Sequence, residues 1–236
     1  MPAAREALLD AALAALGRLP WSAVRMVDVA AAAGVSRQTL YNEFGSKEGL
    51  ARALVRREAD AYLHGVERLL DDRHPPQLRT DRPARSDRGA GIDRPARIDR
   101  GAGMERGAGT DRPGPPPLGP ERLALVAEWI VAEARDRPLL RALLTGGWTE
   151  RLPAPRPARS ASLASAVPAQ RRADAGAPAP AELVAATLAR TDARTAPSCE
   201  LAVRLALSYI VAPGPQGVGQ TVRSALSARS RTAGDR

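Results

Sequence analysis

Apolar side chains recur at helical spacing along most of the first seventy residues. In residues 3–19 they form one stripe, which ends at Pro20. Two shorter patterns follow, from Met26 to Ala33 and from Ser36 to Phe44, and a long one runs from about Ser46 to Leu70. No run alternates β-branched and polar residues between turns, so we expect no sheet. The pattern predicts an all-α protein.

Helical patterns return in the second half of the chain. They cover Glu121–Arg135, Pro138 to about Thr145, Ala181–Arg190 and Ser198–Ala212. We therefore expect an N-terminal three-helix domain over residues 1–46 and a connecting helix over residues 47–72. A second helical domain is expected over residues 121–214.

Three stretches interrupt or follow these helices. Residues 73–120 carry a short repeat rich in Asp, Arg, Gly and Pro, with almost no apolar side chains to stack, and we expect a disordered insertion. The alternative is an Arg-rich arm that touches the DNA backbone without reading sequence. Residues 151–180, rich in Pro and Ala, are expected to be a flexible loop, and residues 215–236 a flexible tail.

Charge favours an anionic partner only weakly. The chain holds 35 Lys and Arg against 26 Asp and Glu, a formal net charge of +9, which places nucleic acid first and a membrane surface second. Much of the excess lies in the Pro-rich stretches and the tail, while residues 1–60 are nearly balanced. A single Cys excludes an internal disulfide, and no apolar run reaches ~18 residues. We expect a cytoplasmic protein that does not span a membrane.

Residues 25–50 have the spacing of a helix-turn-helix. Such a motif needs a small residue where its helices cross, a glycine at the turn and an apolar anchor in the second helix, and Ala30, Gly34 and Leu40 supply these. Val35 and Phe44 would pack the pair from inside. The second helix of such a motif lies in the major groove with its N-terminal side chains toward the base edges.

The run from Asp28 to Leu50 resembles the DNA-binding signature of the tetracycline-repressor (TetR) family. Gly-Val-Ser, Leu-Tyr, Phe and Ser-Lys-Glu fall at the family's spacing, and the resemblance covers roughly residues 3–60. Glu200–Ser208 also resembles a common closing helix of the family. The resemblance implies a sequence-specific transcriptional regulator, and a repressor above all.

By this resemblance, Arg37, Gln38 and Asn42 would read bases, because each can donate or accept a hydrogen bond at a base edge. The residues that would hold phosphates are Ser36, Thr39, Tyr41 and Lys47. As an alternative, Arg37 and Asn42 are ordinary solvated side chains. The sequence departs from the family at Arg25, where a Ser or Thr usually caps the second helix; either Ser22 takes over the cap or Arg25 itself reaches a phosphate.

The resemblance assigns ligand binding and dimerisation to the second half. Candidate residues for the wall of a pocket for a small hydrophobic ligand are Trp129, Ile130, Leu143 and Trp148. These residues would equally fill a small core. The helix over Ser198–Ala212 is apolar on much of its surface and needs a partner, so we expect a homodimer that reads a pseudo-palindromic site. The expected interface residues are Leu201, Leu205, Ser208 and Ala212.

Other classes of function are disfavoured. Two His and one Cys form no metal-ligand or nucleophile pattern, and no glycine-rich phosphate loop is present, so we expect no enzyme, no metal and no cofactor. A repressor that ignores ligands and uses its second half only to dimerise remains an alternative. A non-specific nucleic-acid binder that uses the Arg-rich insertion is another.

Overall fold

The computed structural model describes residues 2–71, 118–154 and 176–234, and every regular element in these ranges is helical. The expectation of an all-α fold is therefore confirmed. The expected insertion over residues 73–120 and most of the expected loop over residues 151–180 lie outside the described residues. Within the described ranges, no helix is both long enough and apolar enough to cross a membrane.

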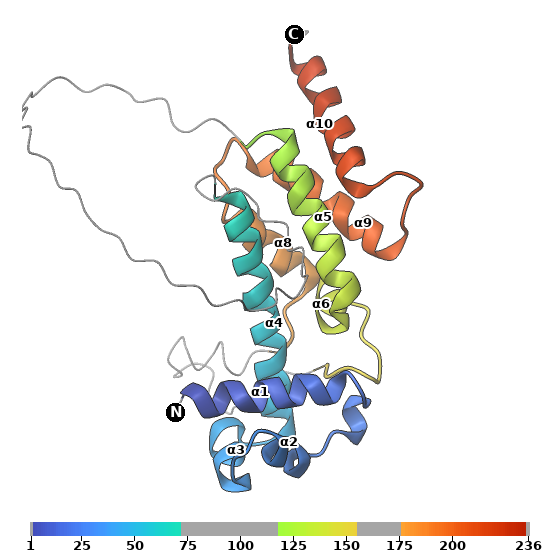
Figure 1. Cartoon of the computed structure of the whole chain (residues 1–236). Helices are drawn as coiled ribbons and strands as arrows, with labels where there is room; N and C mark the ends of the chain where they lie inside the picture. Colours follow the sequence, from blue (N-terminus) through green and yellow to red (C-terminus); the bar gives the residue numbers. More distant parts are fainter. Residues whose placement is uncertain (1, 72–117, 155–175, 235–236) are drawn as a thin grey trace, which may run out of the picture. The chain divides into compact units, whose positions relative to one another are not determined.

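The N-terminal elements pack around one end of the longest helix (Figure 1). We call residues 2–54 the head. Helix α1 buries Leu8, Leu9 and Ala12 and contacts α2, α3 and α4. The elements of the head before α4 are α1 (Pro2–Leu16), the short 3-10 helix η1 (Trp21–Ala23), α2 (Met26–Ala32) and α3 (Arg37–Phe44).

Helix α4 (Lys47–Leu70) belongs to both halves of the protein. Its first turn is capped by Ser46, whose Oγ accepts a hydrogen bond from the Gly49 backbone N at 3.1 Å. Its buried face extends from Leu50 to Leu70. The N-terminal part contacts α1 and α3, and the helix also contacts α5, α6 and α8. A change in the position of α4 would therefore be felt in the head and in the C-terminal helices.

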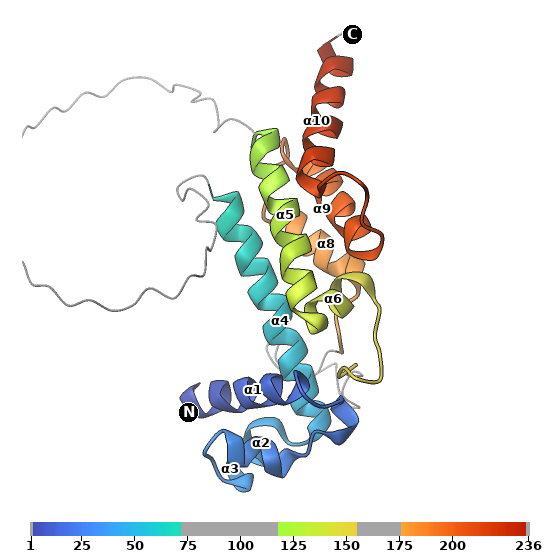
Figure 2. The ribbon, with the colours of Figure 1, turned by 45° about the vertical axis from the view of Figure 1, so that its right-hand side comes forward.

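The C-terminal helices lie along one side of the second part of α4 (Figure 2). Three of them, α5, α6 and α8, begin with a proline, which suits the first helical position because its missing N–H would have no partner there. Arg137 alone separates α5 from α6. The bounds are α5 (Pro120–Asp136), α6 (Pro138–Thr145), α8 (Pro180–Leu188) and α9 (Ala196–Val211).

The expectation of a flexible tail at residues 215–236 is wrong. Residues Val218–Gly234 form helix α10, which packs on α5 and α9 (Figure 1). Val218, Val222 and Leu226, four residues apart, place one narrow buried stripe against those helices. The rest of the helix is rich in Ser, Ala, Thr and Arg, so the stripe is too thin to stand out as an amphipathic pattern.

The ends of α3 and α4 approach each other at Gly49. A Cβ on this residue would lie 1.9 Å from the Phe44 carbonyl oxygen, which is a backbone atom and cannot swing aside as a side chain would. Gly49 therefore sets how closely α4 follows α3.

We expect Gly49→Ala to lower the free energy of unfolding by about 1–3 kcal/mol, as overpacking typically does. Alanine would otherwise favour a helix over glycine by up to about 1 kcal/mol, so the sign is diagnostic. Chemical denaturation followed by circular dichroism measures it. Gly17→Ala is the control, because its Cβ would meet its nearest neighbour, the Ala14 carbonyl oxygen, at an ordinary 3.5 Å. A Gly49→Ala protein as stable as the parent would contradict the contact.

Candidate nucleic-acid interface

The turn between α2 and α3 is built on Gly34, whose φ is +66°. The Gly34 N donates to the Ala31 carbonyl at 3.1 Å, and the Val35 N donates to the Ala30 carbonyl at 3.0 Å. This is the Schellman arrangement, in which the chain reverses out of a helix through a left-handed residue and satisfies its last carbonyls. The turn thereby ends α2 and sets the direction in which α3 leaves.

The proposed scaffold residues lie between the helices. Ala30 and Leu40 are 1% and 0% exposed, so α2 and α3 cross with their side chains fully packed. Phe44 is buried at the end of α3, and Val35 is half-buried beside the turn. Arg5 of α1 covers the Phe44 ring, with its guanidinium carbon 4.7 Å from the ring centroid, and its Nη1 lies 3.4 Å from Glu43 Oε2. The sequence analysis did not single out Arg5.

Helix α3 begins at a capped N-terminus. The Ser36 Oγ accepts a hydrogen bond from the Thr39 backbone N at 3.0 Å and lies 2.9 Å from the Thr39 Oγ1. The cap satisfies one of the free N–H groups at the helix start. Ser36 and Thr39, both expected at phosphates, thus hold one another at the end of α3 that would approach DNA.

The outer face of α3 presents the proposed base readers. Arg37, Gln38 and Asn42 are exposed, and Gln38 Nε2 donates to Asn42 Oδ1 at 2.8 Å. Tyr41 is 48% exposed, which is unusual for a large ring and leaves it available for contact. The structure therefore brings these four side chains together on one solvent-facing surface, with two of them already paired.

Lys47 is the first residue of α4, and its side chain packs against η1. Its Nζ donates to the Ser22 carbonyl at 3.2 Å and lies 5.1 Å from the centroid of the Trp21 ring. Partial burial lowers the pKa of its ammonium group. Trp21 and Ser22 thus seat the ammonium near the N-terminus of α4, where backbone N–H groups also attract anions.

Arg25 precedes α2 without capping it through its side chain. Its Nε lies 2.9 Å from Asp28 Oδ2, and its Nη2 lies 3.3 Å from Asp28 Oδ1. This two-point contact raises the pKa of the guanidinium. A spacing of three residues between opposite charges on a helix start is visible in the sequence and would have identified the pair.

The proposed pocket residues lie in and around the core. Ile130 and Leu143 are fully buried, and Trp129 stacks on Tyr62 with ring centroids 6.1 Å apart. Trp148 is half-buried against the same cluster. Neither of the two hollows described below is lined by these four residues. A pocket at this place stays a prediction.

The proposed dimer residues lie on the outer side of α9. Leu201 and Leu205 are half-buried, and Ser208 and Ala212 are exposed. Val211 beside them is 68% exposed. The opposite side of the helix faces the core.

Comparison with known proteins identifies the head. Residues 8–54 match the family model described as bacterial regulatory proteins, tetR family. Over this range the head is similar to that family. The matched range contains the Gly34 turn, the capped recognition helix α3 and the start of α4, which are the parts whose geometry is given above.

A curated relative and two solved structures extend the comparison. The HTH-type transcriptional regulator AlkX of Mycobacterium tuberculosis (strain ATCC 25618 / H37Rv) is 49% identical over 67 residues, which cover 28% of this chain and about a third (32%) of the relative. The TetR family repressor AlkX from Dietzia sp. strain DQ12-45-1b is a solved structure with 20% sequence identity and a TM-score of 0.43. The superposition covers 95% of this chain and 91% of the Dietzia chain. A tetR-family transcriptional regulator from Streptomyces coelicolor is 16% identical in sequence and superposes with a TM-score of 0.45. The superposition covers 95% of this chain and 77% of the Streptomyces chain.

We expect Gly34→Ala to destabilise the head by about 1–2 kcal/mol, because an L-residue with a Cβ disfavours the left-handed region. Gly34→Asn should cost less, since asparagine adopts this region more readily. No atom lies within 4 Å of a Cβ built at Gly34, so the loss would be conformational and not steric. Thermal unfolding of the three proteins tests this; equal losses for Ala and Asn would speak against it.

Proposed function

We propose that this protein is a sequence-specific DNA-binding transcriptional regulator that acts as a repressor. The observation that carries the proposal is the exposed surface of α3, where Arg37, Gln38 and Asn42 stand beside a capped helix N-terminus on a Schellman turn. The family match of residues 8–54 supports it. Because the matched relative is covered over only a third of its length, the function of the whole chain is an inference from its head.

In this proposal Arg37, Gln38 and Asn42 contact base edges in the major groove. The Gln38–Asn42 hydrogen bond of the free protein would be exchanged for bonds to bases. Contacts to phosphates would come from Ser36, Thr39, Tyr41 and Lys47, which fix the register of the head on the duplex.

A homodimer would bring two heads to one operator. Leu201, Leu205 and Val211 leave apolar surface on the outer side of α9, and a second copy of the chain would cover it. Ser208 and Ala212 are small enough to allow close approach of two such helices. Two-fold symmetry implies a pseudo-palindromic operator. We place the protein in the cytoplasm, where its DNA would be.

The regulatory signal is proposed to be a small hydrophobic ligand that releases the repressor. Trp129, Ile130, Leu143 and Trp148 remain the candidate wall of its site. The closed packing of Ile130 and Leu143 favours the second candidate, a repressor whose C-terminal helices only dimerise. Thermal-shift screening of the intact protein against varied lipophilic compounds decides between them: a stabilising compound that also lowers operator affinity supports the first, and none supports the second.

The role of each DNA contact is testable by substitution. We expect Arg37→Ala and Asn42→Ala to relax sequence choice by about 1–3 kcal/mol at the base pair that each one reads. Lys47→Ala should instead weaken all sequences alike and reduce the slope of log K against log salt by about one. Operator and scrambled duplexes, titrated at several salt concentrations by fluorescence anisotropy, measure both effects.

Arg18→Ala is the control for these variants, because it removes an equal charge from the exposed turn after α1. Equal losses on operator and scrambled DNA for Arg37→Ala, Asn42→Ala and Lys47→Ala would refute the division into base and phosphate contacts.

The proposed dimer is tested at Leu205. We expect Leu205→Glu to convert the dimer to a monomer at micromolar concentration, because it places a charge in a desolvated apolar interface. Light scattering after size exclusion measures the mass. Ser208→Arg is a second variant at an exposed position, where loss of fold is not expected, and Ser224→Glu on the exposed side of α10 is the control. Dimers that survive both α9 variants would place the interface elsewhere.

A further inference from the structure

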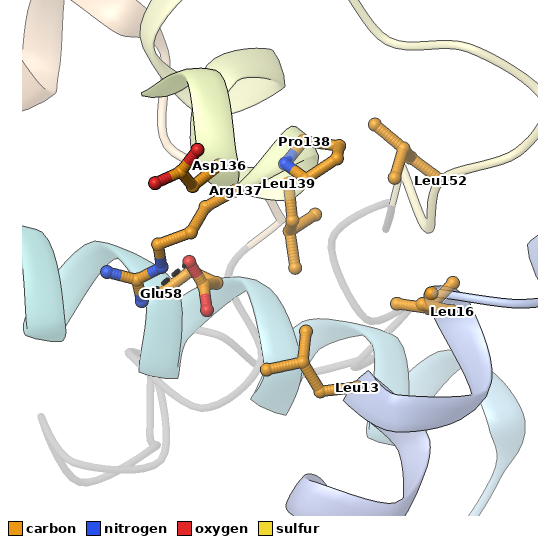
Figure 3. A pocket seen from close by; sticks show the side chains of 9 residues that line it. Leu13, Leu16, Glu58, Asp136, Arg137, Pro138, Leu139 and Leu152 are labelled. Carbon is orange, nitrogen blue, oxygen red and sulfur yellow. Dashed lines mark ion pairs between the residues drawn. The ribbon is translucent and has the colours of Figure 1, made fainter. Parts of the chain in front are cut away.

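A hollow of about 210 Å³ lies between the head and the C-terminal helices (Figure 3). We call it the junction hollow. The residues that line it come from the end of α1, from α4, from the α5–α6 corner and from the segment after α6: Leu13, Leu16, Gly17, Glu58, Asp136, Arg137, Pro138, Leu139 and Leu152.

One side of the junction hollow is apolar. Leu13 and Leu139 point toward each other across it, and Leu16 and Leu152 lie together further along (Figure 3). Leu13 and Leu16 belong to the head, while Leu139 lies in the first turn of α6. An apolar body of about one ring would fit between them, because pockets for small molecules are lined mainly by such side chains.

The other side is charged, with an excess of carboxylates. Glu58 is 3% exposed, and its Oε2 lies 2.9 Å from Arg137 Nη2. Arg137 also pairs with Glu133 through Nη1 at 2.9 Å, and Asp136 lines the hollow at its exposed rim. Burial lowers the pKa of Arg137, but its close contacts with Glu58 and Glu133 outweigh this, so that the net pKa is raised. Arg137 is therefore shared between two carboxylates, and Asp136 adds a further negative charge to the lining of the hollow.

Glu58 keeps unused hydrogen-bonding capacity. The approach of Arg137 to Oε2 is close enough for an ion pair, yet among the described residues this buried oxygen accepts no hydrogen bond of acceptable geometry. Buried carboxylate oxygens are normally both paired and hydrogen-bonded. A protonated nitrogen in the hollow would supply the missing bond and balance the excess negative charge.

A second, larger hollow of about 700 Å³ adjoins the first and shares Leu16, Gly17, Pro138 and Leu152 with it. Its own lining includes Arg141 and Arg151, so its charge has the opposite sign. An anionic ligand would settle there and not beside Glu58. The two hollows can thus be told apart by the charge of the ligand that they accept.

We infer that the junction hollow is an effector site for a small amphipathic cation, with a protonated amine or amidine at Glu58 and an apolar body between Leu13, Leu16, Leu139 and Leu152. The inference rests on the proposed function for its effect on DNA. The site contacts α1 and α6 together, and the Trp21 backbone N donates to the Arg151 carbonyl at 2.9 Å beside it. A ligand bound here contacts both the head and the C-terminal helices, and so directly changes the position of the head relative to those helices.

The test uses three probes with the same phenyl body and different ends: 2-phenylethylamine, 2-phenylethanol and 3-phenylpropanoate. Calorimetric titration of the intact protein at neutral pH, without DNA, should show the amine binding about tenfold or more tighter than the alcohol, because a charge-assisted hydrogen bond is gained. Any binding of the carboxylate should be unchanged by Glu58→Gln, because an anion would occupy the second hollow beside Arg141 and Arg151.

Variants locate the site. Glu58→Gln should bring the affinity for the amine down to that for the alcohol and leave the alcohol unchanged. Glu133→Gln is the matched control, since Glu133 also pairs with Arg137 but does not line the hollow. Leu152→Trp and Leu16→Phe, which fill the space, should abolish binding of both probes, whereas Leu19→Trp at an exposed position outside the hollow should not.

The consequence for DNA is measured separately. Saturating amine should weaken operator binding by a factor within the 5- to 150-fold range of ordinary coupling, and Glu58→Gln should remove the effect. The inference is overturned if no probe binds, if the alcohol binds as tightly as the amine, if Glu58→Gln and Glu133→Gln behave alike, or if bound amine leaves operator affinity unchanged. If the unliganded protein shows no sequence-selective DNA binding, the proposed function is overturned. The ligand titrations, which are done without DNA, would still test the binding site.

Discussion

The continuous helix α4 is the constraint on which the rest of the structure depends. Its first turn touches the end of α3 so closely that Gly49 leaves no room for a side chain, and its later turns are buried among the C-terminal helices. A rigid helix of 24 residues transmits any tilt from one end to the other. The position of α3, which leaves the Gly34 turn, is therefore also coupled through α4 to packing among the C-terminal helices.

In the head, the positions of individual charged and polar side chains matter more than the net charge. Arg25 is held by Asp28, Lys47 by Trp21 and the Ser22 carbonyl, and Gln38 by Asn42. These side chains are already oriented in the free protein, so less conformational entropy would be lost if they bind DNA. The same contacts must be exchanged on binding, which makes the net gain smaller than a count of charges suggests.

The head could be predicted from the sequence because its signals are local. The small residue at Ala30, the turn at Gly34 and the caps at Ser36 and Ser46 act over a few positions. In the structure Ala30 is buried, Gly34 has a positive φ, and each serine caps the helix that follows it. Helix α10 could not be predicted, because its apolar stripe of Val218, Val222 and Leu226 is too narrow to indicate a buried helix by itself. The stripe is buried only because α10 packs on α5. The pair of Glu58 and Arg137 was equally hidden, since 79 positions (137 − 58) separate its members.

The interior of the C-terminal helices bears on where a signal can enter. The Tyr62 and Trp129 rings stack there, and burial raises the pKa of Tyr62 to about 12 while its oxygen accepts a hydrogen bond from the Thr187 hydroxyl at 3.3 Å. A ligand in this place would have to displace packed rings and a buried hydrogen bond before it gained contacts of its own. In the junction hollow beside Glu58 the space already exists, and its walls belong to the head and to the C-terminal helices, whose relative position would decide how α3 meets DNA in the proposed function. A ligand bound there would act on the head without rearranging the core, because the residues that it contacts first include those of α1 in the head.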